Sequence, residues 1–423
     1  MNVLLRRVCI HQPDHPLHLQ RNDIHIQDGL ITAIGLDIQA NGADIWEGED
    51  LHVSLGWVDV GAHSMDPGQE HREDLSSLGR AAARGGYTHV AVFPNTEPVA
   101  HSKAEILYLQ RLNTSQAVRI LPIGAISRHA EGEDIAELYD MHTAGAVAFS
   151  DGAHPVSKAG LLLRALLYVK AVDGVVIDPP MDPTLAGKGQ IHEGVISTLL
   201  GMRGVPSLAE SVQVYRNIQL LGYADSRLVL HAISARDSLD MIRTAKSDGL
   251  RLGATVPAWH LVFTDEAVST FDTRFKLMPP LRETADRDAL RAGLRDGTLD
   301  AIVSMHLPLE DDQKEVEFPY AAFGATGLET TFALCRSHLV PTEIDLDTLI
   351  QRLTVGPRRI LNLPPASIDT GAPADLTVFQ PDQKWTFTVS GQASKGRNNP
   401  LDGQELTGKV FGVINNGKAI RTA

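Results

Sequence analysis

Short apolar runs alternate with longer amphipathic stretches through the middle of the chain. The short runs, such as Thr88-His-Val-Ala-Val-Phe93, have the length of buried strands, and the longer ones repeat apolar residues at helical spacing. We predict strands near 55–60, 88–93, 118–125, 146–149, 175–178, 228–233, 252–257 and 300–304. We predict helices over 104–113, 134–144, 158–171, 207–221, 235–248 and 284–296. This alternation favours an α/β fold, a (β/α)8 TIM barrel.

The two ends of the chain have a different pattern, in which strands are joined by tight turns. Residues 24–35 contain Asp28-Gly29 between two apolar stretches, and residues 410–420 contain Asn416-Gly417. Both dipeptides are typical of β-hairpins. Because chain termini often lie close together, we expect the two ends to form one small composite, sandwich-like β domain. The predicted domains are 1–54 together with 366–423 for the β domain, and 55–365 for the barrel.

The composition indicates a large folded protein and excludes several classes. The chain has 423 residues, 43% hydrophobic and 21% charged, so it can bury a sizeable core. The net charge of -14 argues against a general affinity for nucleic acid or anionic lipid. The sequence has only two cysteines, lacks a signal-peptide pattern and has no apolar run long enough to span a membrane. We therefore expect a cytoplasmic protein that binds neither nucleic acid nor membrane.

Half of a metal-binding motif follows the first predicted barrel strand. The apolar run that begins at Leu55 ends in Gly61-Ala-His63. Two histidines at these positions would point to the same side of the strand end and could hold one metal ion, as in metal-dependent amidohydrolases. With glycine in the first position, only His63 remains for such a site.

Several blocks spread over nearly the whole chain resemble the dihydroorotase branch of the amidohydrolase superfamily. These blocks are Pro94-Asn95-Thr96-Glu97-Pro98, Ala148-Phe149-Ser150-Asp151, Glu193-Gly194, Ala209-Glu210, Pro279-Pro280-Leu281-Arg282, Phe323-Gly324 with Gly327-Leu328-Glu329, and Gly371-Ala372-Pro373-Ala374-Asp375-Leu376. The resemblance implies a barrel whose active members bind zinc through histidines and aspartates at the strand ends. Zinc lowers the pKa of bound water to about 7, and the hydroxide attacks a cyclic amide.

The resemblance implies that the metal site of this chain is largely dismantled. The lost ligand positions are Gly61, Pro179, Ala232 and Met305. Met305 stands where the catalytic aspartate belongs, while His63 and Asp151 remain as vestigial positions. A catalytic zinc site normally uses three protein ligands. We therefore expect no bound metal and no other cofactor.

The substrate-binding positions that the resemblance implies have also changed, mostly from polar to apolar. Met65 replaces an arginine that would bind the substrate carboxylate, Met278 replaces an asparagine, and Leu309 replaces a histidine. Asn95 is retained within its Pro-Asn-Thr-x-Pro block. We interpret these residues as a vestigial substrate pocket.

Some of these residues have competing interpretations. Asp151 is equally well explained as a helix cap or as a partner of a backbone amide, and Asn95 as a residue that orders its turn. Neighbouring residues that could rebuild a metal site are His154, Asp178, His231 and His306. We expect His231 to face the helices, because a shift of one residue along a strand turns a side chain to the opposite face.

The resemblance is strongest to non-catalytic dihydroorotase-like subunits that assemble with aspartate carbamoyltransferase. It implies a pseudoenzyme with a structural role in pyrimidine biosynthesis, in a homo- or hetero-oligomer whose partner is the transferase catalytic chain. The main alternative is an active zinc-dependent dihydroorotase or related cyclic amide hydrolase with a remodelled metal site. A third possibility is a small-molecule sensor that uses the emptied barrel mouth as its pocket.

Overall fold

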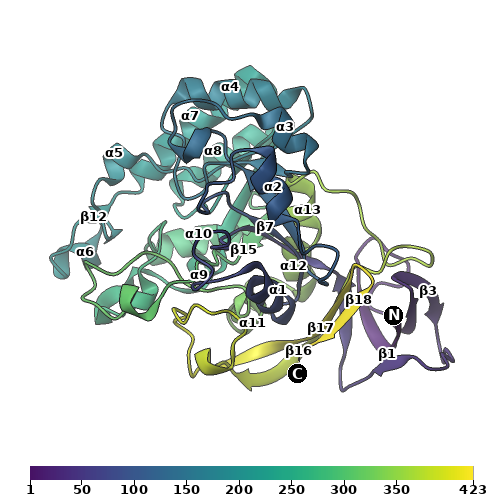
Figure 1. Cartoon of the computed structure of the whole chain (residues 1–423). Coiled ribbons are helices and arrows are strands. Elements are labelled where there is room, and N and C mark those ends of the chain that lie inside the picture. Colours follow the sequence, from purple (N-terminus) through teal and green to yellow (C-terminus); the bar gives the residue numbers. More distant parts are fainter. Residues whose placement is uncertain (423) are drawn as a thin grey trace.

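A computed structural model describes residues 1–422 and confirms the predicted TIM barrel (Figure 1). Eight strands form the barrel sheet, and each hydrogen-bonds in parallel to the next. They are β6 (Trp57–Ala62), β7 (Tyr87–Val92), β8 (Arg119–Gly124), β9 (Ala148–Phe149), β10 (Val176–Asp178), β13 (Leu228–Leu230), β14 (Leu252–Pro257) and β15 (Ala301–Val303). Each lies where the sequence predicts a strand.

The barrel closes between β6 and β15. The buried Asp59 carboxylate accepts hydrogen bonds from the backbone N–H of Ser304 at 2.9 Å and from its hydroxyl at 2.6 Å. Beyond the ends of the two strands, the N–H of His63 donates to the carbonyl of His306 at 2.9 Å. These bonds fix the segments that follow the first and last strands relative to each other.

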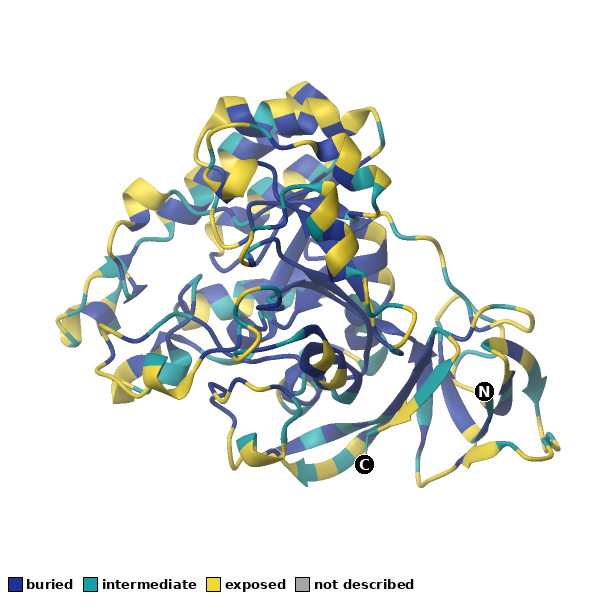
Figure 2. Ribbon diagram, viewed as in Figure 1, coloured by how far each residue is buried: buried dark blue, intermediate teal, exposed yellow. Residues whose placement is uncertain are grey.

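Side chains of the barrel strands alternate between two apolar layers. The layer inside the barrel includes Val58, Val60, Ile177, Val229 and Val303. The layer between the strands and the surrounding helices includes Trp57, Val176, Leu228, Leu230 and Ile302. Both faces of the strands are therefore buried, as expected for a parallel barrel (Figure 2). The alternation also determines which residues beyond each strand point into the barrel.

Helices surround the barrel and connect its strands. They are α1 (Leu75–Arg84), α2 (Lys103–Leu109), α3 (Leu138–Thr143), α4 (Ala159–Lys170), α7 (Leu208–Ala224), α8 (Asp237–Ser247), α9 (Ala258–Val262), α10 (Thr284–Arg295), α11 (Thr331–Leu339), α12 (Leu346–Leu353) and α13 (Val355–Ile360). A projecting segment after β10 contains α5 (Pro183–Ala186), β11 (Ile191–His192), α6 (Val195–Leu199) and β12 (Gly204–Val205) (Figure 1). No helix within residues 1–422 has the length and apolar character needed to cross a membrane.

The two ends of the chain pair in one sheet, as predicted. Its strands are β1 (Asn2–His11), β2 (Arg21–Gln27), β3 (Leu30–Gly35), β4 (Asp44–Trp46), β5 (His52–Leu55), β16 (Leu376–Thr386), β17 (Glu405–Asn415) and β18 (Lys418–Arg421). The ends meet where Leu55 of β5 pairs with Leu376 of β16. Both predicted hairpin turns are present, between β2 and β3 and between β17 and β18. The domain boundaries at 54/55 and 365/366 stay predictions.

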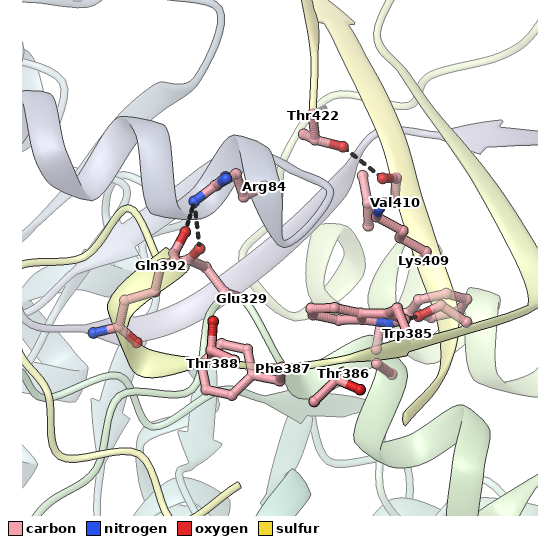
Figure 3. Close-up of a pocket in the computed structure, with 14 residues that line it drawn as sticks. Arg84, Glu329, Trp385, Thr386, Phe387, Thr388, Gln392, Lys409, Val410 and Thr422 are labelled. Atoms are coloured by element: carbon pink, nitrogen blue, oxygen red, sulfur yellow. Dashed lines mark hydrogen bonds and ion pairs between the residues drawn. The ribbon is translucent and has the colours of Figure 1, made fainter. Parts of the chain in front are cut away.

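The long β16–β17 hairpin also packs against the barrel, beside α11 and the end of α1 (Figure 3). A cavity of about 210 Å³ lies between them. Arg84 forms an ion pair with Glu329 at 3.7 Å and donates to the carbonyl of Gly391. Glu329 also accepts the backbone N–H groups of Ala393 at 2.9 Å and Ser394 at 3.0 Å. The glutamate of the Gly-Leu-Glu block therefore holds the C-terminal segment on the barrel.

Candidate functional site at the barrel mouth

A cavity of about 430 Å³ opens at the carboxyl ends of the barrel strands. This end of a TIM barrel is where the loops converge and where active sites form. Its lining includes Gly61, His63, Phe93, Pro179, Met181, Glu210, His231, Ala232, Trp259, His260, Leu277, Met278, Met305, Leu307 and Phe323. Most of these side chains are apolar. Many of the segments that the sequence analysis selected thus meet at this cavity, but its lining is mostly apolar.

The lining offers little charge for an anionic substrate. Within residues 1–422, no lysine or arginine lines the cavity and Glu210 is its single carboxylate. That carboxylate is buried and accepts hydrogen bonds from the N–H groups of Ser234 at 3.0 Å and Ala235 at 3.0 Å, and from the hydroxyl of Ser238 at 2.7 Å. Glu210 therefore holds the segment that leads into α8. A substrate carboxylate would lose its hydration here without gaining a cation.

His63 and His231 both contact the Phe93 ring. The centroid of the phenyl ring is 5.5 Å from that of His63 and 5.1 Å from that of His231. Burial, with His306 and Arg72 nearby, lowers the pKa of His63 to about 3. Burial alone lowers the pKa of His231 to about 3. Both imidazoles are therefore neutral at physiological pH.

Gly61, which the sequence analysis interprets as a lost ligand position, leaves little room for a larger residue. Its φ of +88° is in the left-handed region, and a Cβ atom there would lie 2.7 Å from the His231 ring and 2.7 Å from Phe93. Phe93 and His231 thus occupy the space in which a ligand side chain at position 61 would begin. A side chain at position 61 would therefore require these two rings to move.

The expectation that His231 faces the helices is wrong. Val229 points into the barrel and Leu230 toward the helices, so His231 points inward again. Its Nδ1 bonds the hydroxyl of Thr255 at 3.1 Å, whereas its Nε2 is buried without a partner. Ala232 also reaches the cavity because its backbone turns to φ +60° and leaves the strand alternation.

Asp151 and Asn95 take up structural roles. The Asp151 carboxylate accepts the N–H of Ser127 at 2.8 Å and its hydroxyl at 2.6 Å, which agrees with pairing to a backbone amide. The Asn95 amide donates to the Asp151 carbonyl at 3.0 Å and accepts the N–H of Ala153 at 2.9 Å. Neither side chain lines the cavity within the described chain. Both residues order the loop after β9.

The other residues that could rebuild a metal site do not converge on His63. Asp178 faces α7, where it accepts a hydrogen bond from Asn217 at 2.6 Å, and burial raises its pKa to about 6. His306 is buried with its Nε2 at 3.4 Å from a carboxylate oxygen of Glu73. His154 is exposed. None of the three lines the cavity in the part of the chain described.

The positions assigned to the vestigial substrate pocket are only partly brought together. Met278 and Met305 line the cavity. Met65 is buried outside it, and Leu309 is buried where its N–H donates to Asn398 at 3.1 Å. The C-terminal segment that contains Asn398 therefore covers the position at which the resemblance implies a substrate-binding histidine.

The donors present do not fit a zinc ion at the barrel mouth. Throughout residues 1–422, only two groups of three His, Cys, Asp or Glu residues have ligand atoms within 4.8 Å of one another. They are Cys9 with His11 and His52, and His192 with Glu283 and Asp286. Neither group includes His63. A catalytic zinc needs three protein ligands, so we derive no metal-dependent step from this cavity.

Sequence reasoning missed two polar side chains of the cavity. Trp259 and His260 follow β14 on α9, and the Trp259 indole nitrogen and His260 Nδ1 are buried without partners. His260 Nε2 lies 3.1 Å from the carbonyls of Pro279 and Pro280. The available signal was that Trp259 and His260 closely follow the carboxyl end of a barrel strand, where active-site residues lie. The sequence position does not show which way a side chain points.

The buried His231 imidazole should make the fold sensitive to acid. An unfolded histidine gains a proton near pH 6.5 but folded His231 only near pH 3, so the free energy of unfolding falls as pH drops between these values. His231 should contribute about 2 kcal/mol to the loss between pH 7.5 and pH 5, and His63, with a pKa of about 3, adds a similar amount. Urea unfolding with EDTA present at both pH values checks this. His231→Gln should remove the contribution of His231 to the loss of stability, whereas the exposed control His154→Gln should leave the loss unchanged. Equal acid sensitivity in the wild type and both variants would contradict this prediction.

Comparison with known proteins places this barrel in a family. The sequence profile described as "Dihydro-orotase-like" matches residues 52–238. A protein named dihydroorotase from Pelotomaculum thermopropionicum is 40% identical over 404 residues, which cover 95% of this chain and 94% of that protein. The chain belongs to the dihydroorotase family. Another member, a dihydroorotase from Syntrophus aciditrophicus, is 38% identical over 423 residues, with 99% of each chain covered.

Solved structures support the dihydroorotase-like fold over the full chain. The L-hydantoinase (dihydropyrimidinase) from Arthrobacter aurescens superposes with a TM-score of 0.87 at 21% identity, covering 99% of this chain and 96% of that one. The dihydropyrimidinase from Brevibacillus agri NCHU1002 gives 0.84 at 19% identity, covering 100% and 95%. At such identities the likeness shows the fold alone.

Proposed function

We propose that this member of the dihydroorotase family is catalytically inactive. The observation that carries the proposal is the barrel mouth itself, where His63 belongs to no group of three metal donors among residues 1–422 and where Phe93 and His231 fill the space beside Gly61. A pocket without cationic side chains is also poorly suited to a carboxylate-bearing ring. The chain therefore keeps the fold of the family but not the metal-binding side chains that the resemblance implies at the barrel mouth.

We further propose that the protein serves as a cytoplasmic structural subunit for the catalytic chain of aspartate carbamoyltransferase. The partner comes from the resemblance to non-catalytic subunits. A row of exposed apolar residues along α7 supports a role in protein assembly: Leu208, Val212, Tyr215 and Tyr223 are 53%, 42%, 59% and 77% exposed. Their spacing places them on one helix face. An apolar row of this kind on a surface helix is typical of an interaction site.

Co-assembly with the transferase tests the structural role. When the two purified chains are mixed, we expect one larger species by size-exclusion chromatography with light scattering, and retained transferase activity on dilution. Val212→Glu with Tyr215→Glu should weaken the assembly at least about 10-fold, which corresponds to about 1.4 kcal/mol. The control Tyr320→Glu changes a side chain that is 80% exposed on a different segment and should have no effect. Separate elution of the two wild-type chains would contradict the role.

A second candidate function is hydrolysis or closure of a cyclic amide by an active dihydroorotase with a remodelled site. The names of the relatives favour it, because proteins 37–40% identical over most of the chain are called dihydroorotase. On names alone this candidate is the better supported, whereas the donor geometry favours the inactive subunit. The two predict opposite results for turnover.

A further inference from the structure

Three side chains of metal-binding type, Cys9, His11 and His52, gather on one face of the β domain, and none of them lines the barrel-mouth cavity. Cys9 and His11 lie two residues apart on β1, and β5 places His52 in parallel register with Cys9. Side chains two apart on a strand share a face. The ligand atoms of all three lie within 4.8 Å of one another, and Cys9 and His11 are only 7% and 4% exposed.

Each histidine of this cluster is held by a carboxylate through its outer nitrogen. His11 Nδ1 lies 2.6 Å from an oxygen of Asp347 on α12, and His52 Nε2 lies 3.2 Å from an oxygen of Asp50. The inner nitrogens, His11 Nε2 and His52 Nδ1, face each other at 2.6 Å. Carboxylates that orient histidines in this way are typical of the surroundings of metal ligands.

The protons available do not satisfy this chain of contacts. Asp347, His11, His52 and Asp50 form three successive contacts, and each needs one proton between its two atoms. Two neutral imidazoles supply two protons. When both outer nitrogens donate to the carboxylates, the inner nitrogens present two lone pairs to each other. Arg21 also pairs with Asp50, yet with two imidazole protons one of the three contacts stays unsatisfied, and a metal cation between the inner nitrogens removes that deficit.

Burial disfavours the proton and the nearby thiol favours the metal. An imidazolium here is costly because a buried charge loses its hydration, and His11 is only 4% exposed. Cys9 supplies a sulfur donor beside the two inner nitrogens. A set of one thiolate and two imidazoles suits zinc, which would need the nitrogens to separate to about 3.3 Å for bonds of about 2.0 Å.

We propose that Cys9, His11 and His52 form a zinc-binding site whose fourth position is open to water or another ligand. Binding displaces the Cys9 thiol proton and the proton shared by the imidazoles, and both are released to solvent. Because Asp347 belongs to a barrel helix, the ion ties the β domain to α12. The site does not depend on the proposed function and would exist in an active enzyme as well.

Zinc content of matched variants tests the site. Protein is equilibrated with excess Zn²⁺, freed of unbound metal by gel filtration and measured by elemental analysis. Wild-type protein should hold about one zinc per chain. Two control variants should hold the same amount: His63→Ala at the barrel mouth, and His192→Ala in the group that His192 forms with Glu283 and Asp286. His11→Ala and Cys9→Ser should lose it, with Kd raised at least about 100-fold. No zinc in the wild type, or loss through His63→Ala or His192→Ala, would overturn the proposal.

A measurement on the unaltered protein guards against misfolded variants. Co²⁺ in place of Zn²⁺ should give a thiolate-to-cobalt charge-transfer band and tetrahedral visible absorption, and Zn²⁺ should displace both. The other cysteine, Cys335, is fully buried in the barrel core, so a thiolate band reports Cys9. Cobalt bound without a thiolate band would contradict the site. This result is separate from turnover, so the two proposals can fail independently.

Discussion

Purified protein supplied with excess Zn²⁺ should leave dihydroorotate unopened and carbamoyl aspartate uncyclised. The reaction needs a metal cation that lowers the pKa of bound water and a carboxylate that accepts the proton of that water. At position 305, where the resemblance implies this carboxylate, the chain has a methionine. An enzyme of this kind accelerates its reaction at least about 10⁶-fold, and we expect the whole acceleration to be absent. Ultraviolet absorbance of dihydroorotate follows the reaction, with the Pelotomaculum relative as the positive control.

The control variants decide what a positive signal would mean. Turnover that scales with protein and disappears in His63→Ala would establish the active-enzyme alternative and end the pseudoenzyme proposal. Turnover unchanged in His63→Ala would indicate a contaminating hydrolase, because an active barrel mouth needs this residue. Zinc content alone does not decide, since the Cys9–His11–His52 site would account for about one ion per chain.

Gly61→Ala should destabilise the fold by about 2–4 kcal/mol, although it adds a single methyl group. The new Cβ would lie 2.7 Å from both His231 and Phe93, and the backbone has φ +88°. Overpacking of a rigid site costs about 1–3 kcal/mol, and a left-handed conformation of a residue with a Cβ adds about 1 kcal/mol. Gly61→His, which introduces the ligand that the resemblance implies, should be at least as destabilising and should not give turnover. Urea unfolding monitored by circular dichroism measures both.

Gly371→Ala separates the two causes of that loss. Gly371 has a similar φ of +93° but nothing within 4 Å of its Cβ position, so only the backbone cost of about 1 kcal/mol applies. If Gly61→Ala costs no more than Gly371→Ala, Phe93 and His231 give way easily, and the mouth could be remodelled by one substitution. The description of a closed ligand position would then be wrong.

The barrel strands could be located from the sequence because each is a short buried run bounded by turn residues. Val58 and Val60 fill the barrel while Trp57 packs outside it, so the run is apolar apart from the buried Asp59. Helix α1 could not be recognised in this way, because Ser77 and Gly79 are among its buried residues. Its capping box, formed by Asp74 and Ser77, was the signal that the apolar pattern overlooks.

The candidate site was predictable only where residue identity decides the chemistry. Glycine, proline, alanine and methionine offer no useful zinc donor in any geometry, so the sequence alone supports the interpretation that Gly61 and Met305 stand at lost ligand positions. The direction of His231 was not, because it depends on where the strand alternation ends. The partner of Asp151 is Ser127, 24 residues away, and only the folded chain brings them together.

Anomalous diffraction at the zinc edge, from crystals equilibrated with Zn²⁺, tests the central claim most directly. The account predicts no ion at the barrel mouth beside His63, because too few donors converge there. It places the ordered zinc of this chain between Cys9, His11 and His52. A fully occupied zinc bound to His63 and at least two further protein atoms at the barrel mouth would contradict it.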